Sequence, residues 1–394
     1  MNSFKYYVPT KVIFGKGAEK ETGKQIKAQK GKRVLIHYGS GSVVRSGLLK
    51  RVEESLEAAG IFYVELGGVV TNPRLSLVYE GIALAKSKNI DFLLAVGGGS
   101  VIDSAKAIAY GAANEGDVWD FYDGRRRASG CLPVGAVVTI AAAGSEMSNS
   151  SVITKEEGNS KRSYNSGLGR PCFAIMNPEL TLTVPDYQTA CGCTDILIHT
   201  MEHYFTNGGS MEITDHMAEA LMRTVIENAR ILKADPGNYE ARAEVMWAGS
   251  LSNNGLTGCG NDGGDFSCHM LEHEIGGMYD VAHGAGLAAI WGSWARYVYQ
   301  NCLPRFYRFA VKVMGVPEEG SEEAIALKGI EAMEDFYHEI HMPISLPELG
   351  IFPTKEELKE LAHNCSVATG GSRGSARVLY EKDMLEIYRM AVQR

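Results

Sequence analysis

Residues that can bind a divalent metal ion occur in two short stretches of the chain. Asp195 and His199 are four residues apart, so on a helix their side chains would project from one face, about 5 to 6 Å apart. His269 and His273 repeat this spacing, and His283 follows. Carboxylate and imidazole groups are common ligands of Fe²⁺ and Zn²⁺. The pattern predicts one metal centre, although spacing alone leaves open whether His269, His273 or both are ligands.

The neighbours of these residues have less specific patterns. We expect a helix break at Gly276-Gly277 and a new helix that begins near His283, which could then point back at the first pair. His203 is interpreted as an ordinary helical histidine, and Glu202 as a residue that is either solvated or behind the ligands. Cys191 and Cys193 form a single CxC pair, which is weak evidence for a zinc site; the eight scattered cysteines fit reduced thiols better.

A glycine-rich turn far upstream could bind a phosphate. The segment DFLLAVGGGSVIDSAKAIA has the pattern of a buried strand, a turn at Gly97, Gly98, Gly99 and Ser100, and a helix. Glycines let the backbone approach a phosphate, and the start of the following helix favours an anion. GGGS matches neither GxGxxG nor a Walker A sequence, so an ordinary tight turn is the alternative.

A second turn, formed by Gly39, Ser40, Gly41 and Ser42, follows the apolar run RVLIHY. Dinucleotide-binding folds often contact the adenosine ribose at this junction. An acidic residue that could hold a free 2′-hydroxyl is absent there, whereas the serines and Arg45 could accommodate a 2′-phosphate. The turn therefore favours NADP(H) slightly over NAD(H).

The sequence HMLEH at residues 269 to 273 also matches HxxEH, a zinc-peptidase pattern in which a glutamate activates water. A metallopeptidase is therefore the main alternative. This interpretation leaves the GGGS turn and the Asp195–His199 pair unexplained, because a peptidase has no use for a dinucleotide. A metal centre together with a nucleotide turn instead indicates hydride transfer.

Composition excludes several other functions. The 394 residues include 39 basic and 47 acidic side chains, with a formal charge of −8, and the longest basic run is Arg125 to Arg127. Nucleic-acid binding is therefore not expected, and a small substrate is. Apolar runs are shorter than the roughly 18 residues of a membrane helix, and the first residues lack the apolar block of a signal peptide. We expect a cytoplasmic protein that does not bind membranes.

The order of predicted elements indicates two domains. Apolar strands at 33–38, 62–66, 91–96 and 134–140 alternate with amphipathic helices at 48–59 and 75–88, which is typical of a parallel α/β sheet. Long helical patterns then dominate, at 215–232, 239–254 and 321–341. We predict an α/β dinucleotide-binding domain at 1–187 and an all-helical metal-binding domain at 188–394.

Over essentially its whole length the chain resembles the iron-containing (group III) alcohol dehydrogenase family, in particular its butanol dehydrogenase and aldehyde reductase branch. The resemblance rests on FGKGA at 14–18, TNP at 71–73, GGGSVIDSAKAIA at 97–109, AAAGSEMS at 141–148, DILIHTMEHYF at 195–205 and HMLEHEIGGMYDVAHG at 269–284. It implies a dehydroquinate-synthase-like architecture and a homodimer. Glycerol dehydrogenases and dehydroquinate synthase are more distant relatives, and a member of those groups is a further alternative.

The resemblance also implies roles for single residues. The family usually has TTAGTGSE where this chain has TIAAAGSE, so a cofactor hydrogen bond near Ala143 is in doubt. The implied activity is reversible oxidation of a primary alcohol, or reduction of an aldehyde, with NADP(H) or NAD(H) and Fe²⁺ or Zn²⁺. The implied metal ligands are Asp195, His199, His269 and His283, and His273 would face the nicotinamide and substrate. Gly98, Ser100 and Asp103 would meet the pyrophosphate and nicotinamide side of the coenzyme. Asn72 and Thr139 would line the cofactor site, and Lys161 would lie near the adenosine ribose.

Overall fold

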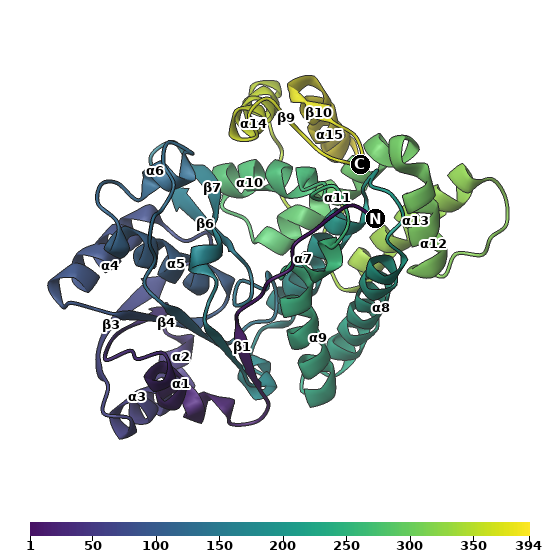
Figure 1. Ribbon diagram of the computed structural model, residues 1–394. Coiled ribbons are helices and arrows are strands. Elements are labelled where there is room, and N and C mark those ends of the chain that lie inside the picture. The colour runs from purple at the N-terminus through teal and green to yellow at the C-terminus, as the bar shows by residue number, and fades with distance from the viewer. The chain divides into compact units, whose positions relative to one another are not determined.

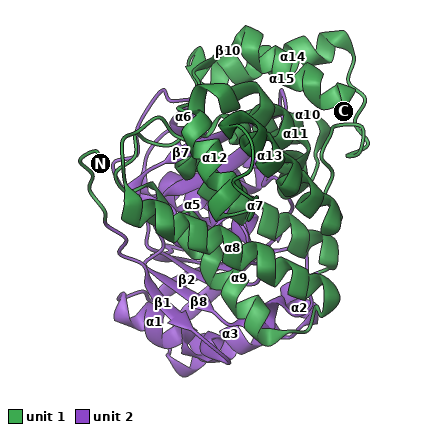
Figure 2. Cartoon of the chain, turned by 90° about the vertical axis from the view of Figure 1, so that its right-hand side faces the viewer, with its two compact units in different colours: residues 1–6, 185–394 green, residues 7–184 purple.

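Six short strands form one parallel sheet within residues 7–184 of the computed structural model, which describes residues 1–394 (Figure 1). Residues 7–184 form one of two units, here called the sheet unit. Residues 1–6 and 185–394 form the other, here called the helical unit, and Figure 2 colours the two separately. No helix of the structure combines the length and apolar character needed to cross a membrane.

The strand order of the sheet is β1-β8-β5-β4-β2-β3, and all neighbouring pairs are parallel. Helices cover both faces, so the central strands are apolar along their whole length. Val34 and Ile36 of β2 pack in a core with α1 and α3, whereas His37 of β2 faces α5 on the other side. The strands are β1 (Lys11–Phe14), β2 (Arg33–Gly39), β3 (Phe62–Val69), β4 (Phe92–Gly97), β5 (Val134–Val138) and β8 (Phe173–Met176).

The rest of the sheet unit consists of crossover helices and one antiparallel hairpin. The hairpin strands β6 and β7 follow β5 and pair residue by residue from Ser150 and Asn165 to Lys155 and Ser160. The elements are α1 (Thr22–Ala28), α2 (Ser42–Arg45), α3 (Leu48–Ala58), α4 (Leu75–Ser87), α5 (Gly99–Ala113), α6 (Trp119–Tyr122), β6 (Ser150–Lys155) and β7 (Ser160–Asn165).

Nine helices form most of the helical unit. Helices α7 and α11 are its most enclosed elements, because nearly every side chain of α7 from Ala190 onward and of α11 from Gly284 to Ala295 is buried. A helix that is buried all round lies in a core. The elements are α7 (Asp186–Tyr204), α8 (Glu212–Ala234), α9 (Tyr239–Ser252), α10 (Ser267–Tyr279), α11 (His283–Val298), α12 (Leu303–Lys312), α13 (Glu322–Glu339), α14 (Lys355–Ala368), β9 (Ser372–Arg373), β10 (Leu379–Tyr380) and α15 (Glu381–Gln393).

The fold class predicted from the sequence is confirmed, with local differences. The predicted strands and helices correspond to β2, β3, β4, β5, α3, α4, α8, α9 and α13. Strands β1 and β8 and the β6–β7 hairpin were not predicted, and neither was the short β9–β10 pair in the helical part. The expected helix break at Gly276-Gly277 is wrong: α10 continues to Tyr279, and Asp280, with a φ of 51°, ends it.

Candidate functional site

Helix α7 positions the first two candidate ligands. It begins after Pro185 and turns Asp195 and His199 to the same side, as their spacing predicts. The Nδ1 atom of His199 lies 2.9 Å from Oδ1 of Asp195 and 3.0 Å from the main-chain oxygen of Asp195. Both side chains are buried. The pair therefore presents a carboxylate and an imidazole inside the helical unit.

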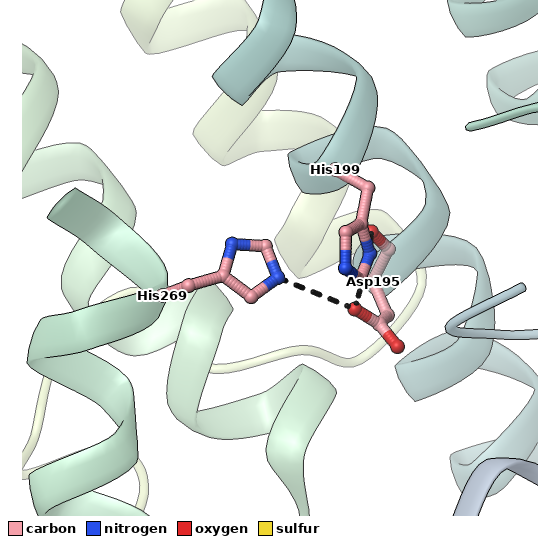
Figure 3. Close-up of side chains that lie close together, drawn as sticks. All are labelled: Asp195, His199 and His269. Atoms are coloured by element: carbon pink, nitrogen blue, oxygen red, sulfur yellow. Dashed lines mark hydrogen bonds and ion pairs between the residues drawn. The ribbon is translucent and has the colours of Figure 1, made fainter. Parts of the chain in front are cut away.

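Helix α10 brings a second imidazole to this pair. His269 Nε2 lies 3.7 Å from Asp195 Oδ1, and Figure 3 shows dashed lines that join one Asp195 carboxylate oxygen to the rings of both His199 and His269. One ligand atom from each of Asp195, His199 and His269 lies within 4.8 Å of the other two. The His199 and His269 ring centroids are 4.3 Å apart. Three potential ligands from two helices thus meet at one point.

His283 is the first residue of α11, and its Nε2 lies 3.8 Å from the same Asp195 oxygen. Glycine makes this approach possible, since a Cβ on Gly284 would lie 2.1 Å from the main-chain oxygen of Cys191 in α7. A Cβ on Gly286 would similarly lie 2.9 Å from Cγ of Glu272 in α10. The start of α11 therefore packs against both α7 and α10. His283 approaches the Asp195 carboxylate, but the potential metal-binding group that contains His283 is formed with Glu272 and His273.

The donor set suits a divalent cation. Asp195 Oδ1 and both ring nitrogens of His269 are buried and lie close to charged neighbours, but they make no hydrogen bond of satisfactory geometry, although buried polar atoms normally do. Burial opposes ionisation of Asp195, but His199 and His269 overcome this and hold its pKa well below its usual range. Burial also disfavours a charged His269, yet Asp195 and Glu202 raise its pKa to about 9. These atoms favour a positive charge at the centre of the set.

The remaining residues of the HMLEH segment have other partners. His273 is buried one turn after His269, and its ring centroid lies 5.8 Å from that of His283. Glu272 accepts a hydrogen bond from His283 Nδ1, so its carboxylate is engaged with a ring. In the peptidase alternative this glutamate would have to activate water. That interpretation is not favoured by the geometry.

His203 and the cysteines lie outside the potential metal-binding groups. His203 has the expected structural role: its Nδ1 lies 2.9 Å from Thr257 Oγ1, and burial, with His199 and His269 nearby, lowers its pKa to about 3. All eight cysteines are free thiols, and none lies in a potential metal-binding group. Cys191 Sγ instead lies 3.8 Å from Met342 Sδ.

In the sheet unit the turn after β4 is made of closely packed backbone. Gly97 ends β4, Gly98 has an extended conformation, and Gly99 begins α5. None of the three has a positive φ, so backbone conformation does not require glycine, and space is clearly short only at Gly97. A Cβ on Gly97 would lie 2.5 Å from Val101 Cγ2, and one on Gly99 would lie 3.4 Å from the Ala143 Cβ. The start of α5 is therefore a bare N-terminus of the kind that binds anions.

The other candidate nucleotide residues lie near the same edge of the sheet. The turn Gly39–Ser42 follows β2 and Thr139 follows β5, and these strands flank β4. The Thr139 N–H donates to Gly97 O over 3.1 Å. Asn72 follows β3, and the next residue, Pro73, accepts a hydrogen bond from Thr154, which is opposite Lys161 in the β6–β7 hairpin. Except for Lys161 in the hairpin and Asp103 in α5, the predicted residues thus lie near the carboxyl ends of parallel strands, where α/β sheets bind ligands.

Asp103 has partners that the sequence did not indicate. Its carboxylate accepts hydrogen bonds from Ser145 Oγ at 2.5 Å and from the Val152 N–H at 3.0 Å. Lys106, one turn later, is fully buried and donates to the main-chain oxygens of Ser145 and Ser150, both at 2.7 Å. These bonds attach the segment that follows β5 to α5. A contact between Asp103 and a cofactor stays a prediction.

Comparisons with known proteins extend to both units. The model of the family described as iron-containing alcohol dehydrogenase matches residues 9–178, and its C-terminal counterpart matches residues 189–392. The chain is 39% identical to NADH-dependent butanol dehydrogenase A of Clostridium acetobutylicum, over 99% of both chains. It is 34% identical to the NADPH-dependent aldehyde reductase YqhD of Escherichia coli, over 89% of this chain and 90% of that protein.

A solved structure agrees with the sequence matches. The crystal structure of NADH-dependent butanol dehydrogenase A from Thermotoga maritima covers 99% of both chains with a TM-score of 0.95 and 38% identity. The matched segments contain both the glycine turn and the Asp195 and histidine set. The chain therefore belongs to the iron-containing alcohol dehydrogenase family.

Proposed function

We propose that this NAD(P)H-dependent alcohol dehydrogenase interconverts a primary alcohol and its aldehyde at a single metal centre formed by Asp195, His199, His269 and His283. The observation that carries the proposal is the convergence of the three histidines on one buried carboxylate oxygen of Asp195. The relatives described above are named butanol dehydrogenase and aldehyde reductase, which supports a short aldehyde as substrate.

The ligand set fits Fe²⁺ or Zn²⁺, since both accept imidazole and carboxylate ligands. When bound, the divalent ion would supply Lewis acidity to the substrate oxygen, and the nicotinamide would supply or accept the hydride. Asp195 contributes the one negative charge of the ligand set, and the histidines contribute neutral donors. Burial of Asp195, His199 and His269 limits competition by water for their ligand atoms, whereas the His283 side chain is 25% exposed.

His273 is the candidate for proton transfer. It lies on the same helix as His269, one turn further on, and is close to His283 without belonging to the group around Asp195. In this role its imidazole would take the proton of the alcohol hydroxyl or return one to the product oxygen. Replacing His273 should then reduce turnover while metal is retained.

The sheet unit supplies the coenzyme site in this proposal. The backbone of Gly97, Gly98, Gly99 and Ser100 would hold the pyrophosphate at the start of α5. The turn Gly39, Ser40, Gly41 and Ser42 would contact the adenosine ribose, together with Lys161, and Asn72, Asp103 and Thr139 would line the remainder. These assignments rest on the family resemblance and on the position of the turns at the strand ends.

The coenzyme preference is proposed to be NADP(H). Acidic side chains are absent from the turn after β2, and Arg45 extends over it, because its Nη1 would lie 3.1 Å from a Cβ on Gly41. The guanidinium could neutralise a 2′-phosphate. One relative described above is named NADH-dependent and the other NADPH-dependent. Rates of butanal reduction with NADH and with NADPH therefore test this preference.

We further propose a homodimer in the cytoplasm, with residues 1–187 as the nucleotide-binding domain and 188–394 as the metal-binding domain. The free thiols fit a reducing compartment. Light scattering of the purified protein tests the dimer, and a monomer at micromolar concentration would exclude it.

The proposed function is tested by butanal reduction and metal analysis on one preparation. The protein should contain one Fe²⁺ or Zn²⁺ per chain and oxidise NADPH or NADH only when aldehyde is present. Failure to consume either coenzyme with any short aldehyde would contradict the proposal.

A further inference from the structure

Two buried glutamates lie beside the metal-binding histidines, on the side away from Asp195. Glu202 belongs to α7 and Glu272 to α10, and their side chains are 1% and 0% exposed. Neither belongs to the ligand set proposed above. A buried carboxylate is costly unless charges or hydrogen bonds compensate it, so the partners of these two residues indicate what they do.

Glu272 contacts the ring of His283. Its Oε2 accepts a hydrogen bond from Nδ1 of His283, and the opposite ring nitrogen, Nε2, lies 3.8 Å from Oδ1 of Asp195. The carboxylate thus fixes one edge of the imidazole while the other edge faces the ligand set. It also keeps the proton on Nδ1, because a carboxylate accepts but cannot donate.

Glu202 contacts His269 through a main-chain hydrogen bond and a close approach to the ring, which itself makes no hydrogen bond. Its Oε1 lies 3.3 Å from His269 Nδ1 and accepts the main-chain N–H of the same residue at 3.0 Å. His269 Nε2 faces Asp195 Oδ1 on the other side of the ring, at 3.7 Å. Glu202 therefore contacts both the backbone and the ring of this ligand.

We propose that Glu202 and Glu272 are positioning residues that orient His269 and His283 toward the metal ion. This inference rests on the proposed metal centre. A carboxylate beside Nδ1, hydrogen-bonded at His283 and in close contact at His269, favours the tautomer whose Nε2 lone pair is free, aims that lone pair and makes the ring a stronger donor. The matched geometry of the two rings, with glutamate at Nδ1 and Asp195 at Nε2, carries the inference.

His199 provides an internal contrast. Its Nδ1 contacts Asp195 itself, and its Nε2 lies 3.3 Å from Asn253 Nδ2, so no glutamate holds this ring. Two of the three histidines are thus supported by a buried negative charge. With Asp195, three carboxylates contact these histidines, and removal of either glutamate should weaken metal binding more than loss of packing alone would.

Zn²⁺ affinity, measured on metal-free protein by competition with a chromophoric chelator, tests this role. Glu272→Ala and Glu202→Ala should each bind Zn²⁺ about 10- to 100-fold more weakly than the parent. Glu272→Gln and Glu202→Gln should lose less, since an amide oxygen can still accept the Nδ1 proton. Glu219→Gln is the matched control, because Glu219 is similarly buried but bonds Tyr204 and Arg308. The Zn²⁺ affinity of this variant should stay within about twofold of that of the parent protein.

Absorption spectra of Co²⁺-loaded protein give a second readout. The visible bands of Co²⁺ should shift in Glu272→Ala and stay unchanged in Glu219→Gln. If folded alanine variants bind Zn²⁺ as tightly as the parent, the positioning role is wrong. If they do not fold, the glutamine variants decide: they keep the acceptor but remove the negative charge that makes each ring a stronger donor, so an affinity no weaker than that of the Glu219→Gln control in both would also overturn the role. A parent that binds Zn²⁺ and reduces butanal keeps the proposed function in either case, whereas a parent that binds no divalent ion overturns both.

Discussion

The candidate site of the helical unit is made of side chains, whereas the candidate site of the sheet unit is made of backbone. In the helical unit, side chains from α7, α10 and α11 converge on one carboxylate oxygen. In the sheet unit, the turn between β4 and α5 is bare backbone, packed against Val101, Ile140 and Ala143. A site made of side chains should fail when a side chain is removed. A site made of backbone should fail when a side chain is added, and the following predictions test this difference.

The largest effect is expected from His269→Ala. Loss of a ligand from a four-ligand set should weaken metal binding by more than the roughly 100-fold that an orienting residue can cost, and activity should disappear with the metal. The measurement is metal content and butanal reduction after gel filtration. His203→Gln is the matched control, because His203 is equally buried nearby but bonds Thr257. Metal loss in the control and not in His269→Ala would contradict the ligand assignment.

The next effect tests how the helices position the ligands. In Gly284→Ala the new methyl group would lie 2.1 Å from the Cys191 carbonyl oxygen, so α11 must move away from α7 and carry His283 with it. Metal affinity should fall at least about tenfold, which equals 1.4 kcal/mol. Gly167→Ala serves as the control, since a Cβ there meets open space. Unchanged Zn²⁺ affinity in Gly284→Ala would show that His283 does not depend on this approach.

A buried histidine makes the sheet unit sensitive to acid. Burial lowers the pKa of His37 to about 4, and its ring bonds Leu66 O and Ser104 Oγ, both at 2.8 Å. The pKa of His37 in the folded protein is below its usual 6.5, so neutral His37 contributes fully to the free energy of unfolding above pH 6.5. This contribution is lost as the pH falls toward 4. The loss should approach about 3 kcal/mol. The free energy of unfolding, measured by urea denaturation of metal-free protein, should depend less on pH in His37→Gln than in the parent. An identical pH dependence in the two proteins would refute this prediction.

The smallest pair of effects concerns the coenzyme turn. Gly99→Val should raise the dissociation constant of the coenzyme at least about tenfold, because the side chain would occupy space near the phosphate. Ser100→Ala should change it by no more than about fivefold, the equivalent of one hydrogen bond of about 1 kcal/mol. Fluorescence titration with NADPH and NADH measures both, and metal content should stay constant. A larger effect from Ser100→Ala would mean that side chains, rather than backbone, form this site.

The contrast between the units also explains what the sequence could and could not predict. Residues four apart on a helix must share a face, so the pairing of Asp195 with His199 was predictable and the structure has it. The close approach of α11 to α7 depends on Gly284, because the main-chain oxygen of Cys191 lies directly opposite it. This contact between two helices is not visible in the sequence. The partners of Glu202 and Glu272 depend in the same way on packing between helices.

Short elements were predicted least well. Strand β1 has four residues and an exposed edge, and it is defined by pairing with β8 rather than by its own pattern. Gly276 and Gly277 were expected to break a helix, but tertiary packing buries both inside α10, where a local preference of about 1 kcal/mol is easily outweighed. The GGGS turn was placed correctly between its strand and helix because both neighbours have strong patterns.

The most direct test of the metal centre is titration of metal-free protein with Fe²⁺ or Zn²⁺, followed by butanal reduction with NADPH and NADH. Activity should rise linearly and stop at one equivalent per chain in the parent protein, and should not rise at all in His269→Ala. Full turnover by protein that contains no metal would contradict the central claim that Asp195, His199, His269 and His283 form the catalytic metal site.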